Sequence, residues 1–468
     1  MSLPNPIGRQ REVLYLPSEG HNVVLGAAGS GKTIIAILRA AYLSKKDENE
    51  KTLLVTFNKT LVTYLRALGE AELSNVDIRT YHEFARGYLN SRGKMRLHAI
   101  LDPDDKLSIV AKALEIVKNE GYPDGILQRP AETFVEEIQW LERNGIISED
   151  EYVSANRVGR DESRIPRKER PLVWKVYQNF LSLRTETGYD YDWDDLAQAV
   201  CSEFEIDDSP RMYKHIVIDE GQDFSPVMLR SLSLATSDKG SLTFFGDMAQ
   251  QIYGSRISWR SAGLNIPRIW YFQENYRNTK QIAQLGLAIS KTQYFKGVAD
   301  LVEPHSPKAD GPPPTLVECD GVDKETELAL ENASAMGRTQ FVGLLSRNRS
   351  MDDYFIKAIK HRDKSLKVEK LHRDMKRWNP EPGIFVGTYH SAKSLEFDAV
   401  ILPHCNDDVL PDQSRIAALG STREAEFEEA RLLYVAVTRA RTRLILTYSG
   451  NLTRLLPSDS SLYQKEKA

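Results

Sequence analysis

The chain has 468 residues, of which 27% are charged, and its 62 basic and 66 acidic side chains give a formal net charge of −4. This length predicts two to four domains, and the balance of charge excludes a global basic field, so any nucleic-acid surface must be local. No basic-then-apolar leader and no apolar run long enough to span a bilayer is present. Cys201, Cys319 and Cys405 lack disulfide or zinc spacing. These features predict a cytoplasmic protein without a membrane partner.

The first predicted element is a strand over residues 22–25, followed by a glycine-rich loop and a helical pattern from residue 34. The loop and its flanks consist of Gly26, Ala27, Ala28, Gly29, Ser30, Gly31, Lys32 and Thr33. Glycines let backbone N–H groups wrap an anion, a lysine here reaches the terminal phosphates, and a threonine ligates Mg²⁺. The alternative is a glycine-rich turn with an exposed lysine. Because strand, loop and helix agree, the sequence predicts a nucleoside triphosphate site.

Strand-like apolar runs recur along the chain, each followed by a polar loop and a helical pattern. They cover residues 52–57, 215–218, 241–245, 341–345, 384–387, 399–402 and 444–447. This alternation predicts an α/β fold with parallel sheets, whose ligands lie at the carboxyl ends of the strands. Between residues 89 and 189 the pattern is polar and helical, for example over residues 105–120 and 131–144. That stretch predicts a helical insertion into the first sheet.

Two adjacent carboxylates, Asp219 and Glu220, follow the apolar run at residues 216–218. This position suits Asp219 to hold Mg²⁺ through water, and Glu220 to orient and deprotonate the water that attacks the γ-phosphate. A polar strand end without chemistry is the alternative, and the phosphate loop argues against it. A hydrolase is favoured over a kinase because the carboxylate pair ends a strand and nothing indicates a pocket for a small phosphate acceptor.

With these motifs, from Gln10 to about Ser449, the chain resembles the superfamily 1A DNA helicases of the UvrD/Rep/PcrA type. The resemblance implies two RecA-like P-loop domains that close over ATP and Mg²⁺. Within the quoted motifs, it implies that the nucleotide contacts include Gln10 and Tyr276 at the adenine, Gln250 and Arg277 at the γ-phosphate, Glu396 at the ribose and Arg439 as a second arginine finger. Arginines at these points would stabilise charge on the transferred phosphoryl group.

The resemblance also implies single-stranded DNA as the partner, with 3′-to-5′ polarity. From the motifs, their aromatic faces and their polar groups, the predicted DNA contacts are Phe57, Asn58, Tyr81, His82, Tyr253, Trp259, Arg260, Arg347, Asn348 and His390. Aromatic rings of this kind offer sequence-tolerant stacking. For Trp259 two interpretations stay open, stacking on a base and filling the core.

Three departures from the family pattern stand out. Ser394 replaces the usual glycine, the Trp259-Arg260 pair is displaced by a few residues, and the large helical domain expected between residues 351 and 383 is absent. The charged run at residues 357–377 is either a solvated helix face or a basic strip for phosphates. ATP-driven movement on single-stranded DNA is therefore better supported than vigorous duplex unwinding.

The predicted domains are a first RecA-like core at residues 1–88 and 190–268, a helical insertion at 89–189 and a second RecA-like core at 269–468. The predicted function is an ATP-dependent 3′–5′ DNA helicase or translocase acting on single-stranded DNA or a single-strand/duplex junction. The alternative is a DNA-sensing ATPase subunit that controls a nuclease or other effector protein, in DNA repair or antiviral defence, with little unwinding of its own.

Overall fold

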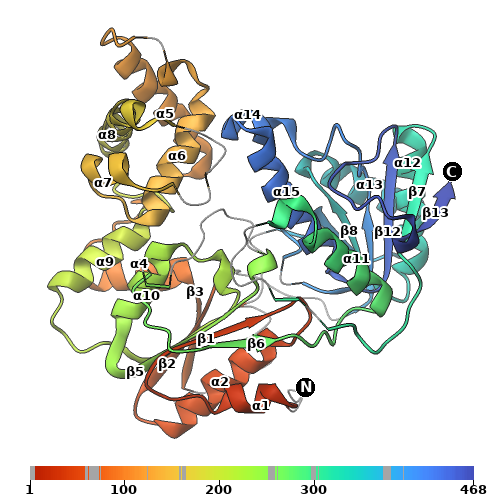
Figure 1. The fold of residues 1–468 in the computed structure, drawn as a ribbon, viewed down its shortest axis with the longest axis horizontal. Helices are drawn as coiled ribbons and strands as arrows, with labels where there is room; N and C mark the ends of the chain where they lie inside the picture. The colour runs from red at the N-terminus through yellow and green to blue at the C-terminus, as the bar shows by residue number, and fades with distance from the viewer. Residues whose placement is uncertain are drawn as a thin grey trace.

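Three bodies make up the protein in the computed structural model, which describes residues 6–57, 62, 73, 75–123, 125–157, 160, 165–250, 259–260, 262–296, 302–303, 305–372, 381–393 and 395–468. Figure 1 shows a first core with the N-terminal strands, a second core with the C-terminal strands, and a helical unit that stands on the first core. Asn58, Tyr253 and Ser394 lie outside the described residues, so the expectations for them stay predictions.

The first core is built on a six-stranded parallel sheet in the order β3-β2-β4-β5-β1-β6. Its strands are β1 (Gly20–Gly26), β2 (Lys51–Thr56), β3 (Val76–Thr80), β4 (Tyr213–Ile218), β5 (Thr236–Gly246) and β6 (Ile269–Phe272). Neighbouring residues of a strand face opposite sides, so both faces are apolar and need cover. Helices α1 (Arg9–Leu14) and α2 (Lys32–Lys46) cover one face, and α4 (Tyr81–Ser91), α9 (Leu196–Ile206) and α10 (Pro226–Ala235) cover the other.

A seven-stranded parallel sheet, in the order β13-β7-β12-β11-β8-β10-β9, forms the second core. Its strands are β7 (Thr315–Cys319), β8 (Phe341–Ser346), β9 (Val368–Lys370), β10 (Gly383–Thr388), β11 (Phe397–Leu402), β12 (Ala440–Ser449) and β13 (Gln464–Lys467). Helices α11 (Lys280–Ser290) and α15 (Thr422–Val437) pack on one face, α12 (Val322–Met336) and α13 (Asp352–Arg362) on the other, and the short α14 (Gln413–Leu419) precedes α15. The two parallel sheets confirm the predicted α/β class.

The helical unit consists of α5 (Pro103–Lys118), α6 (Ala131–Asn144), α7 (Glu149–Ser154) and α8 (Arg170–Glu186), which share a core of their own. Helix α5 begins where Asp102 caps the backbone and proline occupies the first turn, a favoured start for a helix. The two helices predicted in this region lie within two residues of α5 and α6. Single 3₁₀ turns are η1 (Ile126–Gln128), η2 (Arg167–Glu169), η3 (Gly221–Asp223), η4 (Met248–Gln250), η5 (Gln293–Phe295), η6 (Arg349–Met351) and η7 (Ser460–Leu462).

Several features of the chain qualify the sequence-based expectations. Strand β6 pairs with β1 in the first sheet, although it lies beyond residue 268. Residues 363–382 alone separate α13 from β10, and part of the charged run there is paired, as Arg362 with Glu327 and Lys370 with Asp353.

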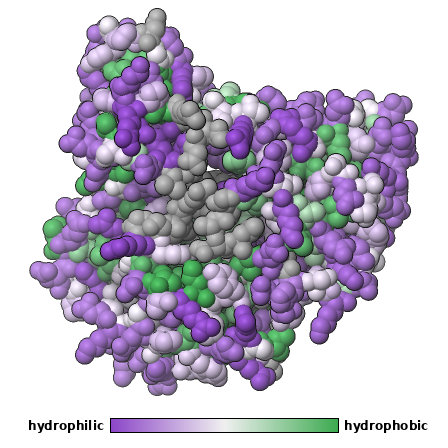
Figure 2. Space-filling model, viewed as in Figure 1, coloured by the Kyte–Doolittle hydropathy of each residue, from purple (hydrophilic) through white to green (hydrophobic). Residues whose placement is uncertain are grey.

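Among the described residues no helix is long and apolar enough to cross a bilayer. The visible surface is mainly hydrophilic, with apolar residues in small areas (Figure 2).

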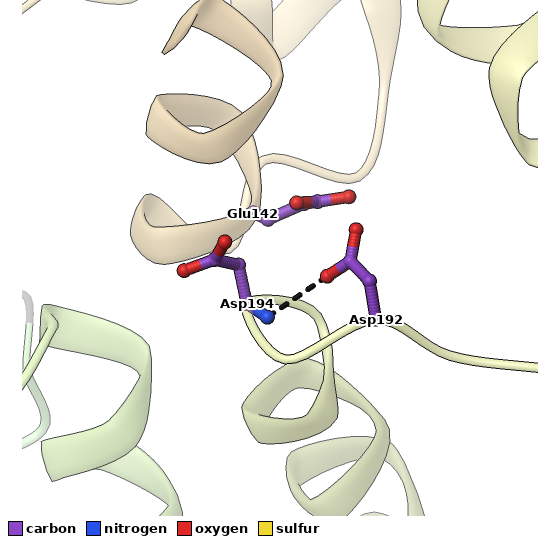
Figure 3. Close-up of side chains that lie close together, drawn as sticks. All are labelled: Glu142, Asp192 and Asp194. Carbon is purple, nitrogen blue, oxygen red and sulfur yellow. Dashed lines mark hydrogen bonds between the residues drawn. The ribbon is translucent and has the colours of Figure 1, made fainter. Parts of the chain in front are cut away.

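A buried ion cluster joins the helical unit to the first core. Glu142 of α6 lies beside Asp192 and Asp194, which precede α9 (Figure 3). Three carboxylates this close resemble a metal site, but the Nζ atom of Lys106 lies 2.8 Å from Glu142, 2.7 Å from Asp192 and 3.6 Å from Asp194. Burial opposes the charge of Lys106, yet the carboxylates outweigh it and raise the pKa of the lysine well above its usual value. The lysine therefore supplies the positive charge that this cluster requires.

Candidate nucleotide and nucleic-acid site

The predicted phosphate loop connects β1 to α2 at the carboxyl edge of the first sheet. Gly29 and Gly31 have φ of 75° and 81°, which glycine adopts without strain, and the N-terminus of α2 then points its N–H groups toward the loop. Nζ of Lys32 is buried and donates to the carbonyl oxygens of Gly26 and Ala27, at 2.8 Å each. Gln10 donates through Nε2 to the carbonyl of Ser30 at 3.1 Å. The predicted adenine-reading residue thus contacts the phosphate loop itself.

We expect Gly29→Ala to weaken nucleotide binding and to destabilise the protein. A methyl group there would lie 2.4 Å from Oδ1 of Asn275 and 2.6 Å from Cβ of Arg277, and the positive φ alone costs about 1–2 kcal/mol. Gly93→Ala is the matched control, because Gly93 has φ of 71° and nothing within 4 Å of the added methyl. Titration with a fluorescent ATP analogue and urea unfolding measure both effects. Equal losses in the two variants would contradict a steric role for Gly29.

Asp219 and Thr33 form an arrangement that fits a magnesium ion. The Thr33 hydroxyl hydrogen-bonds to Asp219, whose carboxylate is buried at the end of β4, and Oδ2 of Asp219 has no hydrogen-bond partner. Burial, followed by the adjacent Glu220, raises the pKa of Asp219 to about 7. Mg²⁺ near phosphates prefers oxygen ligands from carboxylates and hydroxyls. The unpaired carboxylate oxygen of Asp219 and the hydroxyl of Thr33 provide such ligands.

Glu220 occupies the left-handed region, with φ of 53°, a backbone strain that is concentrated at functional sites in proteins. Its Oε2 accepts a hydrogen bond of 2.6 Å from Gln222, and the carboxylate is buried. Burial opposes ionisation most strongly, but Lys32, Lys393 and Arg439 together lower the pKa of Glu220 below its usual value. The carboxylate is therefore ionised at neutral pH and able to accept a proton.

A chain of hydrogen bonds runs from Glu220 to an arginine of the second core. Gln222 bonds to Glu220 and accepts from the backbone N–H of Asp247 at 2.9 Å. Gln250 donates to Asp247 at 2.9 Å and accepts from Nη2 of Arg439 at 2.9 Å. Burial and then Arg277 lower the pKa of Arg439 to about 10, so this arginine remains protonated at neutral pH. The arginine predicted as the second finger therefore reaches the predicted γ-phosphate sensor.

The remaining predicted nucleotide residues line the same region. Arg277 forms an ion pair with Glu396, which connects the segment after β6 to the segment before β11. Tyr276 is 55% exposed, and its backbone N–H donates to the carbonyl of Gly29 at 2.9 Å. An exposed ring fixed beside the phosphate loop is available to lie against a nucleotide base.

Sequence reasoning missed Lys393 and Asp223, which join the two cores. Lys393 of the second core is buried, forms an ion pair with Asp223 and donates to the carbonyl of Gln250 at 3.1 Å. Nearby, the Asn278 amide donates to the carbonyls of Thr438 and Ala440. These residues lie within or beside the recognised motifs, but no spacing in the sequence indicates that they meet.

On the first core, the predicted DNA residues follow β2 and β3. The rings of Phe57 and His82 lie 5.5 Å apart, and His82 lies 5.1 Å from Trp193, so three rings form a continuous aromatic group. Tyr81 is different, because it is fully buried and its hydroxyl bonds to Ser231 at 2.7 Å. The prediction that Tyr81 stacks on DNA is therefore wrong in this structure, since its ring is part of the core beneath the aromatic group.

Trp259 and Arg260 occupy a turn of the first core near its sheet. The Trp259 ring is half-buried and meets Phe244 edge to face, with centroids 4.9 Å apart. This contact favours the core-filling interpretation of Trp259, while its partial exposure leaves one side accessible. Arg260 is exposed.

The second core presents three predicted DNA residues after β8 and β10. Arg347 makes two hydrogen bonds of 2.6 Å to Glu429, so its guanidinium is already paired, whereas Asn348 is exposed. His390 is half-buried, and burial, followed by the charge of Arg347, lowers its pKa to about 3. At neutral pH His390 is therefore uncharged and offers a ring rather than a cation.

Two parallel sheets, with a phosphate loop on the first and an arginine of the second core bonded to Gln250 of the first, define a two-core nucleotide hydrolase. The chain matches the UvrD/REP helicase N-terminal domain over residues 8–276 and the UvrD-like helicase C-terminal domain over residues 349–451. It therefore belongs to the UvrD/REP helicase family of ATP-dependent DNA helicases.

Among its relatives, a Mycoplasma pneumoniae protein named Probable DNA helicase is 24% identical and covers 94% of this chain and 83% of its own length. The ATP-dependent DNA helicase UvrD2 of Mycobacterium tuberculosis is 25% identical, over 94% of this chain and 78% of the relative. The ATP-dependent DNA helicase srs2 of Schizosaccharomyces pombe is 27% identical over 57% of this chain, which spans about a third (32%) of that relative.

Proposed function

We propose that this chain hydrolyses ATP to move along single-stranded DNA in the 3′-to-5′ direction. The observation that carries the proposal is the contact between Arg439 of the second core and Gln250 of the first, 2.9 Å apart and linked through Asp247 and Gln222 to Glu220. A base on one core and an arginine on the other make hydrolysis depend on how the cores are spaced. Cycles of ATP binding and release therefore change that spacing.

In this mechanism Glu220 orients the attacking water and accepts its proton, and Lys32 binds the terminal phosphates. Arg277 and Arg439 stabilise the charge that accumulates on the phosphoryl group during transfer. Mg²⁺, held by Thr33 and Asp219, would offset charge on the triphosphate.

Coupling to DNA follows from the position of the nucleic-acid residues. The aromatic group of Phe57, His82 and Trp193 lies on the first core, while Asn348 and His390 lie on the second. A strand that contacts both faces moves when their separation changes. Sequence-tolerant ring stacking suits movement along any base sequence.

The experiment that tests this function is steady-state ATP hydrolysis with no nucleic acid, single-stranded DNA, duplex DNA or single-stranded RNA at one fixed low salt. We expect several-fold stimulation by single-stranded DNA, because DNA bound to both cores favours the closed arrangement. Strands labelled at one end then report the direction of movement. Equal hydrolysis with and without DNA would contradict the proposal.

A second candidate is a DNA-sensing ATPase subunit that switches a nuclease or other effector. The observation favouring it is the short segment of residues 363–382 at the place where the resemblance predicts a large helical domain. DNA-stimulated hydrolysis without directional movement would support this candidate over the motor.

A further inference from the structure

Helix α6 is attached to the first core through its C-terminal end. Glu142 belongs to the buried cluster around Lys106, and Arg143 donates to Asp194 at 2.8 Å. The helix also contacts α10, and Gly145 at its end lies against Val227 of that helix. These contacts hold the end of α6 on the first core.

Glu136, in the middle of the same helix, is attached to the second core. It forms ion pairs with Arg415 of α14 and, at 2.8 Å, with Arg160, while Arg160 lies 3.4 Å from Glu424 of α15. Arg415 also contacts Glu428 at 2.7 Å. Burial would favour neutral Glu136, but Arg415 and then Arg160 lower its pKa to about 2, so Glu136 is ionised at neutral pH.

The two attachments of α6 lie beside the two nucleic-acid faces. Asp192 and Asp194 flank Trp193, whose ring meets His82 on the first core. Arg415 is close enough to His390 on the second core for its charge to act on that ring. Helices α6 and α14 lie beside each other and are in contact, which joins the helical unit to the second core (Figure 1). Glu136 and Glu142, six residues apart, are separated by about 9 Å along the helix axis.

We infer that α6 is a strap that closes the nucleic-acid path, with the Glu136–Arg415 pair as its latch. The inference rests on the proposed function. The cores meet on the nucleotide side through Lys393–Asp223 and Arg439–Gln250, and α6 joins them on the other side, so a bound strand is enclosed. A strand with a free end threads through the closed ring. A covalently closed circle enters only when the latch opens.

The first experiment compares ATP hydrolysis stimulated by a single-stranded DNA circle and by the linear strand of the same sequence. We expect the circle to stimulate the native protein several-fold less at early times. Glu136→Gln and Arg415→Ala should remove the difference. Arg454→Ala is the matched control, because Arg454 pairs with Glu426 and Asp407, both within the second core. Equal stimulation of the native protein by circle and linear strand would overturn the strap.

The second experiment replaces the latch with a covalent one in a Glu136→Cys/Arg415→Cys variant treated with a short bismaleimide. The native cysteines are buried, so labelling is directed to the new pair. The crosslinked protein should lose stimulation by circles and keep stimulation by linear strands, while the untreated variant accepts both. Absence of a crosslink in DNA-free protein, or full stimulation of crosslinked protein by circles, overturns the inference. If linear DNA stimulates no form of the protein, the proposed function fails, and crosslinking still decides whether the strap is closed.

Discussion

Glu220→Gln is expected to retain ATP binding and to lose turnover by about 10²–10⁴-fold. The amide keeps the shape of the carboxylate but cannot accept the proton of the attacking water. Its neighbours Lys32, Lys393 and Arg439 still provide positive charge for the triphosphate. Single-turnover hydrolysis and titration with a fluorescent ATP analogue separate the two effects.

Two further variants serve as controls for Glu220→Gln. Lys32→Ala should weaken binding itself, since Nζ of Lys32 is the buried amine at the phosphate loop. Glu318→Gln removes a half-buried carboxylate that pairs with Lys467 on the second sheet, and it should change neither ATP binding nor turnover. Unchanged hydrolysis in Glu220→Gln would remove Glu220 as the base.

Lys106→Met is expected to destabilise the helical unit and its attachment by about 3–5 kcal/mol. The substitution leaves Glu142, Asp192 and Asp194 buried together without the cation that lies between them. Methionine restores the packing volume, so the loss reports charge rather than a cavity. Urea unfolding followed by intrinsic fluorescence measures it, because Trp140 and Trp174 belong to the core of this unit.

The matched control for this loss is Lys118→Met on the same helix. Lys118 pairs at the surface with Glu115, at 2.7 Å, and such pairs contribute under about 1 kcal/mol. If divalent metal restored the stability of Lys106→Met, the three carboxylates would be a latent metal site. Equal effects of the two substitutions would show that the cluster contributes no more than a surface pair.

Much of the fold could be predicted because buried parallel strands are continuous apolar runs. Seven apolar runs were predicted as strands downstream of the phosphate loop. Each of them is a strand in the structure, among them β4 and β11. Most of the strands that escaped prediction lie at an edge of a sheet, such as β13, in which every residue is exposed. The exception is β7, which lies between β13 and β12. Strand β3 contains Asp77 and Arg79 and is recognisable only from its pairing with β2.

The nucleotide site was also largely predictable, because its motifs are local and the loop geometry follows from glycine. Contacts between segments far apart in the chain could not be predicted from the sequence. The pairing of Lys393 with Asp223 depends on how the cores meet, and that of Glu136 with Arg415 on where the helical unit stands. The predicted DNA contact of Tyr81 was wrong because a position in a motif does not indicate whether a ring points into the core or outward, and this ring is buried.

The place at which the helical unit enters the chain also bears on how the protein folds. Strand β2 pairs with β4 across the whole insertion, and β1 pairs with β5 across an even longer stretch. The core of the helical unit, by contrast, is drawn from one continuous stretch between Leu101 and Phe180. Local contacts have less loop-closure entropy to overcome, so this unit is expected to form early and to bring β3 and β4 within reach of each other. The insertion would thereby set the order in which the first sheet is assembled.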